Sequence, residues 1–229
     1  MVPEEAVLPE PVSVAPIVSE IVDSFVGVPK FDTVKKAEQW ANENGLADKV
    51  DYSGIEDPKI ANRINETMSE LKEKYKTVSL DSLRVSDMGD DDRFAEVVRF
   101  TSSGGGQAER HSYVMEFNSR HWKTPEAYAA WVEHNSARDW ITSVSSKDTI
   151  THEFGHLLDF QYGSNKVRQN MFKDRRNDLS LISNYAQINH REMVAEAFVH
   201  YNRGGAEAMK NIGGVDWSEF IPFFKKFEK

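Results

Sequence analysis

Cysteine is absent from the 229-residue chain. Disulfide bonds and thiolate metal ligands are therefore excluded, so a metal site would have to use histidine, glutamate or aspartate side chains. The chain also lacks an apolar run of membrane-spanning length, and its N-terminal segment lacks the basic and apolar regions of a secretory signal. We therefore expect no membrane partner.

Basic residues are scarce relative to acidic ones. The chain has 28 lysines and arginines against 37 aspartates and glutamates, which gives a formal net charge of −9. A general nucleic-acid-binding protein normally carries a basic face, so we expect no nucleic-acid partner. Hydrophobic residues make up 39% of the chain and aromatic residues 11%, which is enough for a sizeable core.

Proline is rare except near the N-terminus. Residues 1–30 hold five of the eight prolines, and such a stretch sustains neither a helix nor a regular β-ladder. We expect a proline-rich arm or linker there. Two helical patterns follow, with Asp32 or Thr33 capping the first and Asp57 the second, and they predict a small helical lobe over residues 31–76. Residues 77–229 are expected to form the larger remaining domain.

Strand patterns precede helix patterns in this last segment. Apolar and alternating stretches predict strands, and caps with helical spacing predict the helices that follow, the last one interrupted by Pro222. This order is typical of an α+β domain, here with a small mixed sheet. The predicted strands cover residues 78–85, 94–100 and 111–118, with a short strand or connector at 50–52; the predicted helices cover 125–140, 146–161, 189–203 and 217–227.

The segment His152-Glu153-Phe154-Gly155-His156 reads H-E-x-x-H within the predicted helix 146–161. Residues four apart lie on one face of a helix, so His152 and His156 can offer two imidazoles to one metal ion. Glu153 is rotated away from that line and can reach a metal-bound water instead. This is the zincin arrangement, and it requires a third ligand from elsewhere in the chain.

The third ligand must come from residues after the motif. A third histidine six positions after His156 is the metzincin pattern, but Tyr162 stands there, which disfavours that class. Asp159, one turn beyond His156, is better placed to orient a ligand or pair with a neighbour than to bind directly. The candidates are Asp159, His190, Glu192, Glu196 and His200.

Glu192 and Glu196 are four residues apart on the predicted helix 189–203, hence on one face. This spacing suits a gluzincin, in which one glutamate binds zinc and the carboxylate a turn away contacts the outer nitrogen of a ligand histidine. Two exposed helix carboxylates are the simpler alternative. The H-E-x-x-H helix nearby favours the metal-site interpretation.

The segment 183–198, Ser-Asn-Tyr-Ala-Gln-Ile-Asn-His-Arg-Glu-Met-Val-Ala-Glu-Ala-Phe, together with His-Glu-Phe-Gly-His at 152–156 and Asp159, resembles the catalytic domain of anthrax toxin lethal factor and its family. Members carry H-E-F-G-H-x-x-D, then a tyrosine and, seven residues later, the zinc-binding glutamate of E-x-x-A-E-A-F. Tyr185 and Glu192 stand in that register here. The resemblance covers about residues 109–202.

The resemblance implies a zincin-like fold, and we expect residues 77–229 to form this zincin-like catalytic domain. It also implies a zinc-dependent endopeptidase of the gluzincin class. It implies one Zn²⁺ ion on His152, His156 and Glu192. Glu153 would assist the attack of a zinc-bound water on the peptide bond, and Tyr185 would lie near the bound carbonyl oxygen. Glu196 and Asp159 would support the ligands without binding zinc.

The same family includes secreted proline-specific endopeptidases and domains of phage and mobile-element proteins. We expect a protein or peptide substrate, with a virion or host protein as the wider partner, and a cytoplasmic or virion-associated location in preference to a secreted one. The alternative is a phage-associated or other structural or assembly protein that keeps a zinc-binding zincin fold with little turnover. Ala-Glu-Gln-Trp-Ala at 37–41 and Val-Asp-Tyr-Ser at 50–53 resemble phage structural or minor head proteins.

Two segments have open alternatives. The predicted strand 111–118 is either an ordinary sheet strand or the edge along which an extended peptide binds by β-augmentation. The basic stretch 165–178 is either a solvated loop or short helix, or a lid or contact for an acidic substrate.

Overall fold

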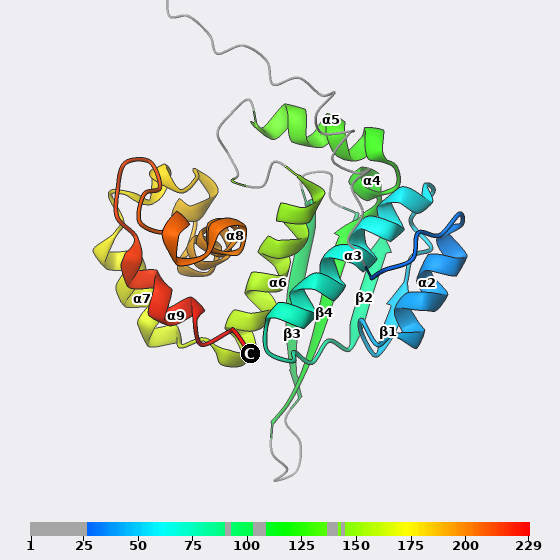
Figure 1. Ribbon diagram of the computed structural model, residues 1–229, viewed down its shortest axis with the longest axis horizontal. Helices are drawn as coiled ribbons and strands as arrows, with labels where there is room; N and C mark the ends of the chain where they lie inside the picture. Colours follow the sequence, from blue (N-terminus) through cyan, green and yellow to red (C-terminus); the bar gives the residue numbers. More distant parts are fainter. Residues whose placement is uncertain (1–26, 90–92, 103–108, 137–141, 143–144) are drawn as a thin grey trace, which may run out of the picture.

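The computed structural model describes residues 27–89, 93–102, 109–136, 142 and 145–229 (Figure 1). They form an α+β arrangement with a small four-stranded mixed sheet, as the order of strand and helix patterns predicts. Most of the predicted proline-rich arm, residues 1–26, lies outside the described residues. The strands are β1 (Lys49–Asp51), β2 (Ser82–Ser86), β3 (Ala95–Ser102) and β4 (Arg110–Asn118).

The sheet has the order β1-β2-β4-β3. β1, β2 and β4 run parallel, and β3 pairs antiparallel with β4 from Ala95↔Phe117 to Ser102↔Arg110. Leu83 and Val85 of β2 and Phe117 of β4 are buried, whereas the second half of β3 is exposed. The period of two thus directs one face of β2 and β4 into the core.

Of the two alternatives for strand 111–118, the edge for peptide binding is wrong and the ordinary sheet strand is confirmed. β4 lies between β2 and β3, so both of its edges are already hydrogen-bonded. β3 lies at one end of the sheet, and no strand of the described residues pairs with its outer edge. Single-strand patterning could not settle this point, because strand order depends on contacts that are distant in sequence.

The N-terminal helices begin where their caps predict. Thr33 accepts a hydrogen bond from the backbone of Lys36 at the start of α2 (Val34–Glu43). Asp57 does the same for α3 (Pro58–Lys74), whose first residue is proline. In Figure 1, α3 and α6 (Ser146–Tyr162) lie side by side across one face of the sheet.

The remaining helices surround this layer. α6 lies between the sheet and α8 (His190–Ala208), so the motif helix contacts both (Figure 1). The basic stretch 165–178 is largely helical, forming α7. The chain after Asp216 is divided next to Pro222 as predicted, between Phe220 and Ile221, but its helical part ends at Phe224 and residues 225–227 form a turn. The other elements are α4 (Ser119–Trp122), α5 (Pro125–Ser136), α7 (Asn165–Asp174), η1 (Leu179–Leu181), η2 (Tyr185–Gln187), η3 (Ser218–Phe220) and α9 (Ile221–Phe224).

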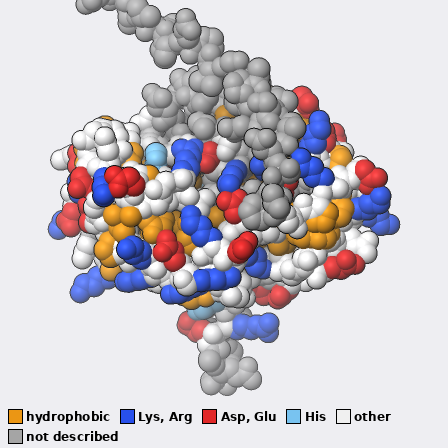
Figure 2. Space-filling model, in the orientation of Figure 1, with side chains coloured by type: hydrophobic (Ala, Val, Ile, Leu, Met, Phe, Trp, Pro, Cys, Tyr) orange, Lys and Arg blue, Asp and Glu red, His pale blue; other side chains and the backbone are white. Residues whose placement is uncertain are grey.

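The hydrophobic core is continuous across these elements. Ala37 of α2, Ile64 of α3, Phe117 of β4, Leu157 of α6 and Phe224 of α9 belong to one buried cluster. The helices predicted as a small lobe therefore share their apolar contacts with the sheet and the motif helix. Acidic and basic side chains are interspersed over the face shown in Figure 2. Each helix in the described part of the chain is too short or too polar to cross a bilayer.

Candidate metal centre

The helix α6 presents the two motif histidines from its buried side. Ser145 caps its first turn, and Asp148 completes a capping box with the backbone and hydroxyl of Ser145. His152 and His156 follow one turn apart, and both side chains are buried. Their Nε2 atoms lie 3.1 Å from each other, as helical spacing predicts for two ligands of one ion.

The small residue of the motif, Gly155, lets α8 approach α6. A Cβ atom built on Gly155 would lie 2.9 Å from Cδ1 of Phe198, closer than real Cβ contacts allow. Phe198 itself is fully buried on α8. The glycine therefore sets the distance between the two helices, and with it the reach of the glutamates on α8.

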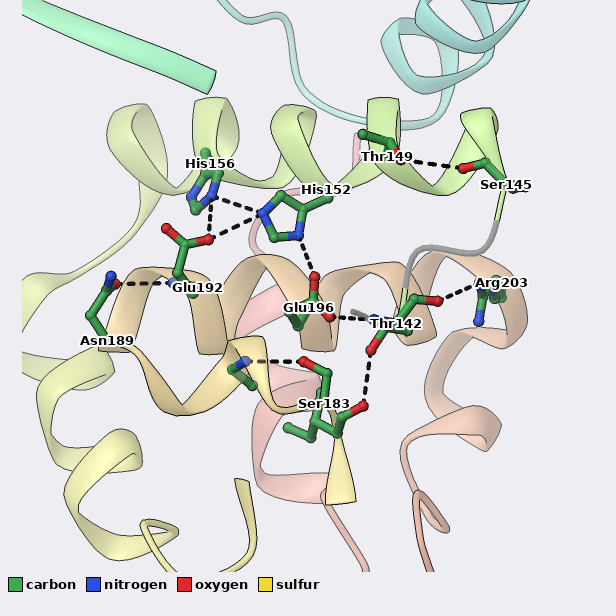
Figure 3. Close-up of polar contacts among 12 residues, drawn as sticks. Thr142, Ser145, Thr149, His152, His156, Ser183, Asn189, Glu192, Glu196 and Arg203 are labelled. Atoms are coloured by element: carbon green, nitrogen blue, oxygen red, sulfur yellow. Dashed lines mark hydrogen bonds and ion pairs between the residues drawn. The ribbon is translucent and has the colours of Figure 1, made fainter. Parts of the chain in front are cut away.

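Glu192 completes the cluster from the first turn of α8. Its Oε2 atom lies 3.2 Å from Nε2 of His152 and 3.1 Å from Nε2 of His156 (Figure 3). Asn189 caps this helix by accepting hydrogen bonds from the backbone of Arg191 and Glu192, which holds the first turn in place. The three side chains form a group that could hold a metal ion.

Glu196 lies one turn further along α8 and faces the other side of the same imidazole. Its Oε1 atom lies 2.7 Å from Nδ1 of His152, and its Oε2 accepts a 2.7 Å hydrogen bond from the backbone of Thr142 (Figure 3). A carboxylate at Nδ1 keeps the proton on that nitrogen, so the lone pair of Nε2 points at the cluster centre. Ser183 also donates a hydrogen bond to the Glu196 carboxylate.

The geometry and donor set fit a zinc ion. Ligand distances of about 2.0–2.1 Å in a tetrahedral site put neighbouring ligand atoms about 3.3 Å apart, close to the spacings of 3.1 to 3.2 Å found here. Two imidazoles and one carboxylate without thiolate match a catalytic zinc site that leaves one position open. His152, His156 and Glu192 all line one cleft, so an ion held by them would be reachable from it.

The electrostatics of the cluster favour a cation. Burial alone would lower the pKa of His152, but contacts with Glu192 and Glu196 raise it well above its usual value. Burial alone would raise the pKa of Glu192, but His156 and His152 hold it well below its usual range. The carboxylates thus stabilise positive charge between the imidazoles, whether a proton or a metal ion carries it.

Glu153 and Tyr185 face the same cleft, whose volume is about 310 Å³. Glu153 is buried, its Oε2 atom has no hydrogen-bond partner among the described residues, and burial raises the pKa of its carboxyl. The ring of Tyr185, from η2, lies 5.9 Å from that of His152. Burial, followed by the charge of Glu192, raises the pKa of Tyr185 far above neutrality, so its hydroxyl remains a hydrogen-bond donor.

Asp159 and the remaining histidine candidates lie outside the ligand cluster. Asp159 pairs with Arg168 of α7 at 2.7 Å, both side chains being buried, so it takes the neighbour-pairing role rather than direct binding. His190 contacts Asn165 at 3.2 Å. His200 is half-buried, and neither it nor His190 belongs to the three-residue group in the described chain.

Some contributing residues escape sequence reasoning. Thr142 stands in a segment with no regular pattern and reaches Glu196 only through the tertiary fold. Arg168 looks like one of several surface cations in a basic stretch, yet it is 5% exposed. Asn189 had a usable signal, because an asparagine just before a helical pattern is a preferred cap. Phe160 and Arg191, which line the cleft, carried no signal of that role.

Comparison of the chain with family models, curated proteins and solved structures gives no match.

Proposed function

We propose that this protein is a zinc-dependent endopeptidase of the gluzincin class with a zincin-like catalytic domain. The observation that carries the proposal is the convergence of His152, His156 and Glu192 within 3.2 Å of one another at a cleft that also contains Glu153. The lethal factor-like register of Tyr185 and Glu192 adds support from the sequence. The substrate is a protein or peptide.

Each side chain has a distinct task in this mechanism. His152, His156 and Glu192 would hold the zinc ion, which when bound would supply a Lewis acid that lowers the pKa of water towards roughly 7. Glu153, which lines the cleft, takes a proton from the attacking water on its carboxylate and passes it to the leaving amine nitrogen. The Tyr185 hydroxyl donates to the oxygen of the former carbonyl as negative charge develops there. Glu196 keeps the His152 proton on Nδ1.

The closing test combines metal content with peptide cleavage. Purified protein dialysed against zinc should hold one ion per chain and cleave members of a diverse peptide library. Glu153→Gln should keep that zinc but lose cleavage by about 10²–10⁴-fold, because only the proton acceptor is removed. Glu192→Gln should lose both. Chelation with EDTA followed by dialysis should abolish cleavage, and added zinc should restore it.

The outcomes separate this function from its rival. Zinc-replete protein that cleaves nothing in the library, or a Glu153→Gln variant with wild-type turnover, would refute the endopeptidase mechanism. Stoichiometric zinc without turnover is the result expected of an assembly protein that retains the metal site. Protein that binds no zinc at all would refute both.

A further inference from the structure

The cleft wall beside the ligand cluster carries a cation that the proposed mechanism does not use. Arg191 lies between the cap Asn189 and Glu192 on α8, and its guanidinium carbon is 4.9 Å from the centre of the Phe160 ring. Arg99, from the edge strand β3, reaches the same ring at 5.5 Å. α6, which carries Phe160, stands between α8 and the sheet (Figure 1). Two cations from different elements thus meet at one aromatic side chain.

Arg191 differs from Arg93, the other arginine that lines the cleft, in having no carboxylate partner among the described residues. Arg93 pairs with Glu96 at 3.3 Å, and Arg168 pairs with Asp159 at 2.7 Å. No acidic side chain in the described residues forms an ion pair with Arg191, and its buried Nε has no hydrogen-bond acceptor. A ligand carboxylate that approaches Arg191 from the cleft therefore competes with no carboxylate of the described residues for its guanidinium.

The chemistry of the Arg191 guanidinium restricts the class of ligand that it can bind. Its planar fork of N–H donors matches a carboxylate, which it binds through two parallel hydrogen bonds. Packing against Phe160 restricts the side chain, so less conformational freedom is lost when a ligand binds. A net charge of −9 provides no general attraction for anions, so any preference for them must come from local cations such as this one.

We propose that Arg191, positioned against Phe160, binds a carboxylate of the peptide substrate next to the scissile bond. The inference rests on the proposed function, because it makes Arg191 a specificity residue of that same cleft. The carboxylate comes either from an Asp or Glu side chain or from the peptide C-terminus. Arg99 adds positive charge from the side of β3.

The test measures peptide binding separately from catalysis. The host protein is zinc-loaded Glu153→Gln, and fluorescent peptides of one sequence report binding by anisotropy. One series moves a single Glu position by position through a peptide with an amidated C-terminus, and the all-Gln peptide is its reference. A second arm compares the free C-terminus with the amide. A carboxylate in the right position should tighten binding at least about tenfold.

Variants at Arg191 assign that gain to its side chain. Adding Arg191→Gln should abolish the carboxylate preference, whereas Arg191→Lys should retain part of it because the charge remains. Arg176→Gln, which removes an exposed arginine outside the cleft lining, is the matched control and should change nothing. Zinc content of each variant verifies that the neighbouring Glu192 still binds metal.

Failure of this inference is distinguishable from failure of the proposed function. The inference is overturned if a carboxylate raises peptide affinity in no position, or if the gain in affinity persists in the Arg191→Gln variant. This holds even if wild-type protein cleaves peptides. Conversely, an Arg191-dependent carboxylate preference without cleavage by the wild type supports the binding site and refutes the endopeptidase activity.

Discussion

The Oε1 atom of Glu196 lies 2.7 Å from Nδ1 of His152, while Glu192, one turn earlier on the same helix, faces Nε2 of that imidazole at 3.2 Å. The two carboxylates therefore contact the two ring nitrogens of one imidazole. Burial alone would raise the pKa of Glu196, but its contacts with His152, Thr142 and Ser183 hold the pKa below its usual value, so it stays ionised. The ring is fixed in both orientation and tautomer.

Glu196→Gln is expected to weaken zinc binding without removing a ligand. The substitution keeps the shape of the side chain but removes the charge at Nδ1, and loss of such a partner typically lowers metal affinity by about 10–100-fold. Competition with a chromogenic chelator measures the change. Glu207→Gln, on an exposed part of the same helix, is the control. Equal zinc affinity in the two variants would remove Glu196 from the metal site.

Tyr185→Phe is expected to slow the chemical step while leaving zinc bound. Loss of one hydrogen-bond donor to a developing oxyanion typically lowers kcat by about 10²–10³-fold, and KM should change much less. Steady-state kinetics on a cleaved library peptide measure both constants. Tyr162→Phe is the matched control, because its hydroxyl bonds the backbone of Thr77 outside the cleft. An increase in KM with unchanged kcat would assign Tyr185 to substrate binding instead.

Gly155→Ala is expected to destabilise the fold even though alanine is the better helix former. Alanine would gain up to about 1 kcal/mol in helix propensity, but its Cβ would press into Phe198 at 2.9 Å. Overpacking of this kind costs about 1–3 kcal/mol, so the free energy of unfolding should fall. Urea denaturation measures it. Combining the change with Phe198→Leu should cost less than the sum of the two single variants, and strict additivity would show that the helices do not touch there.

Arg168→Met is expected to lower stability in a pH-dependent manner. Burial raises the pKa of Asp159, Arg168 opposes that rise, and losing the cation should raise the pKa further. A raised folded-state pKa stabilises at low pH, and that stability is lost as pH rises through it. The variant should therefore be destabilised by about 3–5 kcal/mol at neutral pH, and the deficit should shrink as pH falls towards the ordinary pKa of an aspartate, about 3.9, where Asp159 is protonated in both states.

Urea denaturation of wild type and variant, from neutral pH down to about pH 4, measures the difference in their free energies of unfolding. Asp159→Leu with Arg168→Met should recover much of the stability, because no buried charge is then left unpaired. A deficit that stays constant with pH would show that Asp159 does not carry the effect.

Local residues were sufficient to predict where several helices begin and which face of α6 carries the two motif histidines. Thr33 and Asp57 cap α2 and α3 as predicted, and the spacing of His152 and His156 places both imidazoles on one face of α6. These features depend on contacts within one or two helical turns, which the order of residues sets directly. The α+β class follows from the same local patterns read in sequence.

The helical spacing alone could not decide which of Glu192 and Glu196 faces the Nε2 atoms and which faces Nδ1. Both lie on one face of α8, so spacing permits either to be the ligand; only the approach of α6 at Gly155 and the position of Thr142 bring Glu192 to the Nε2 atoms and Glu196 to Nδ1. The choice of β3 as the edge strand and the exposure of Arg191 to the cleft likewise depend on long-range packing. Sequence by itself determined which side chains could act and on which helices they stand. Tertiary structure decided which atoms meet, because that depends on the distance and rotation between elements far apart in the chain.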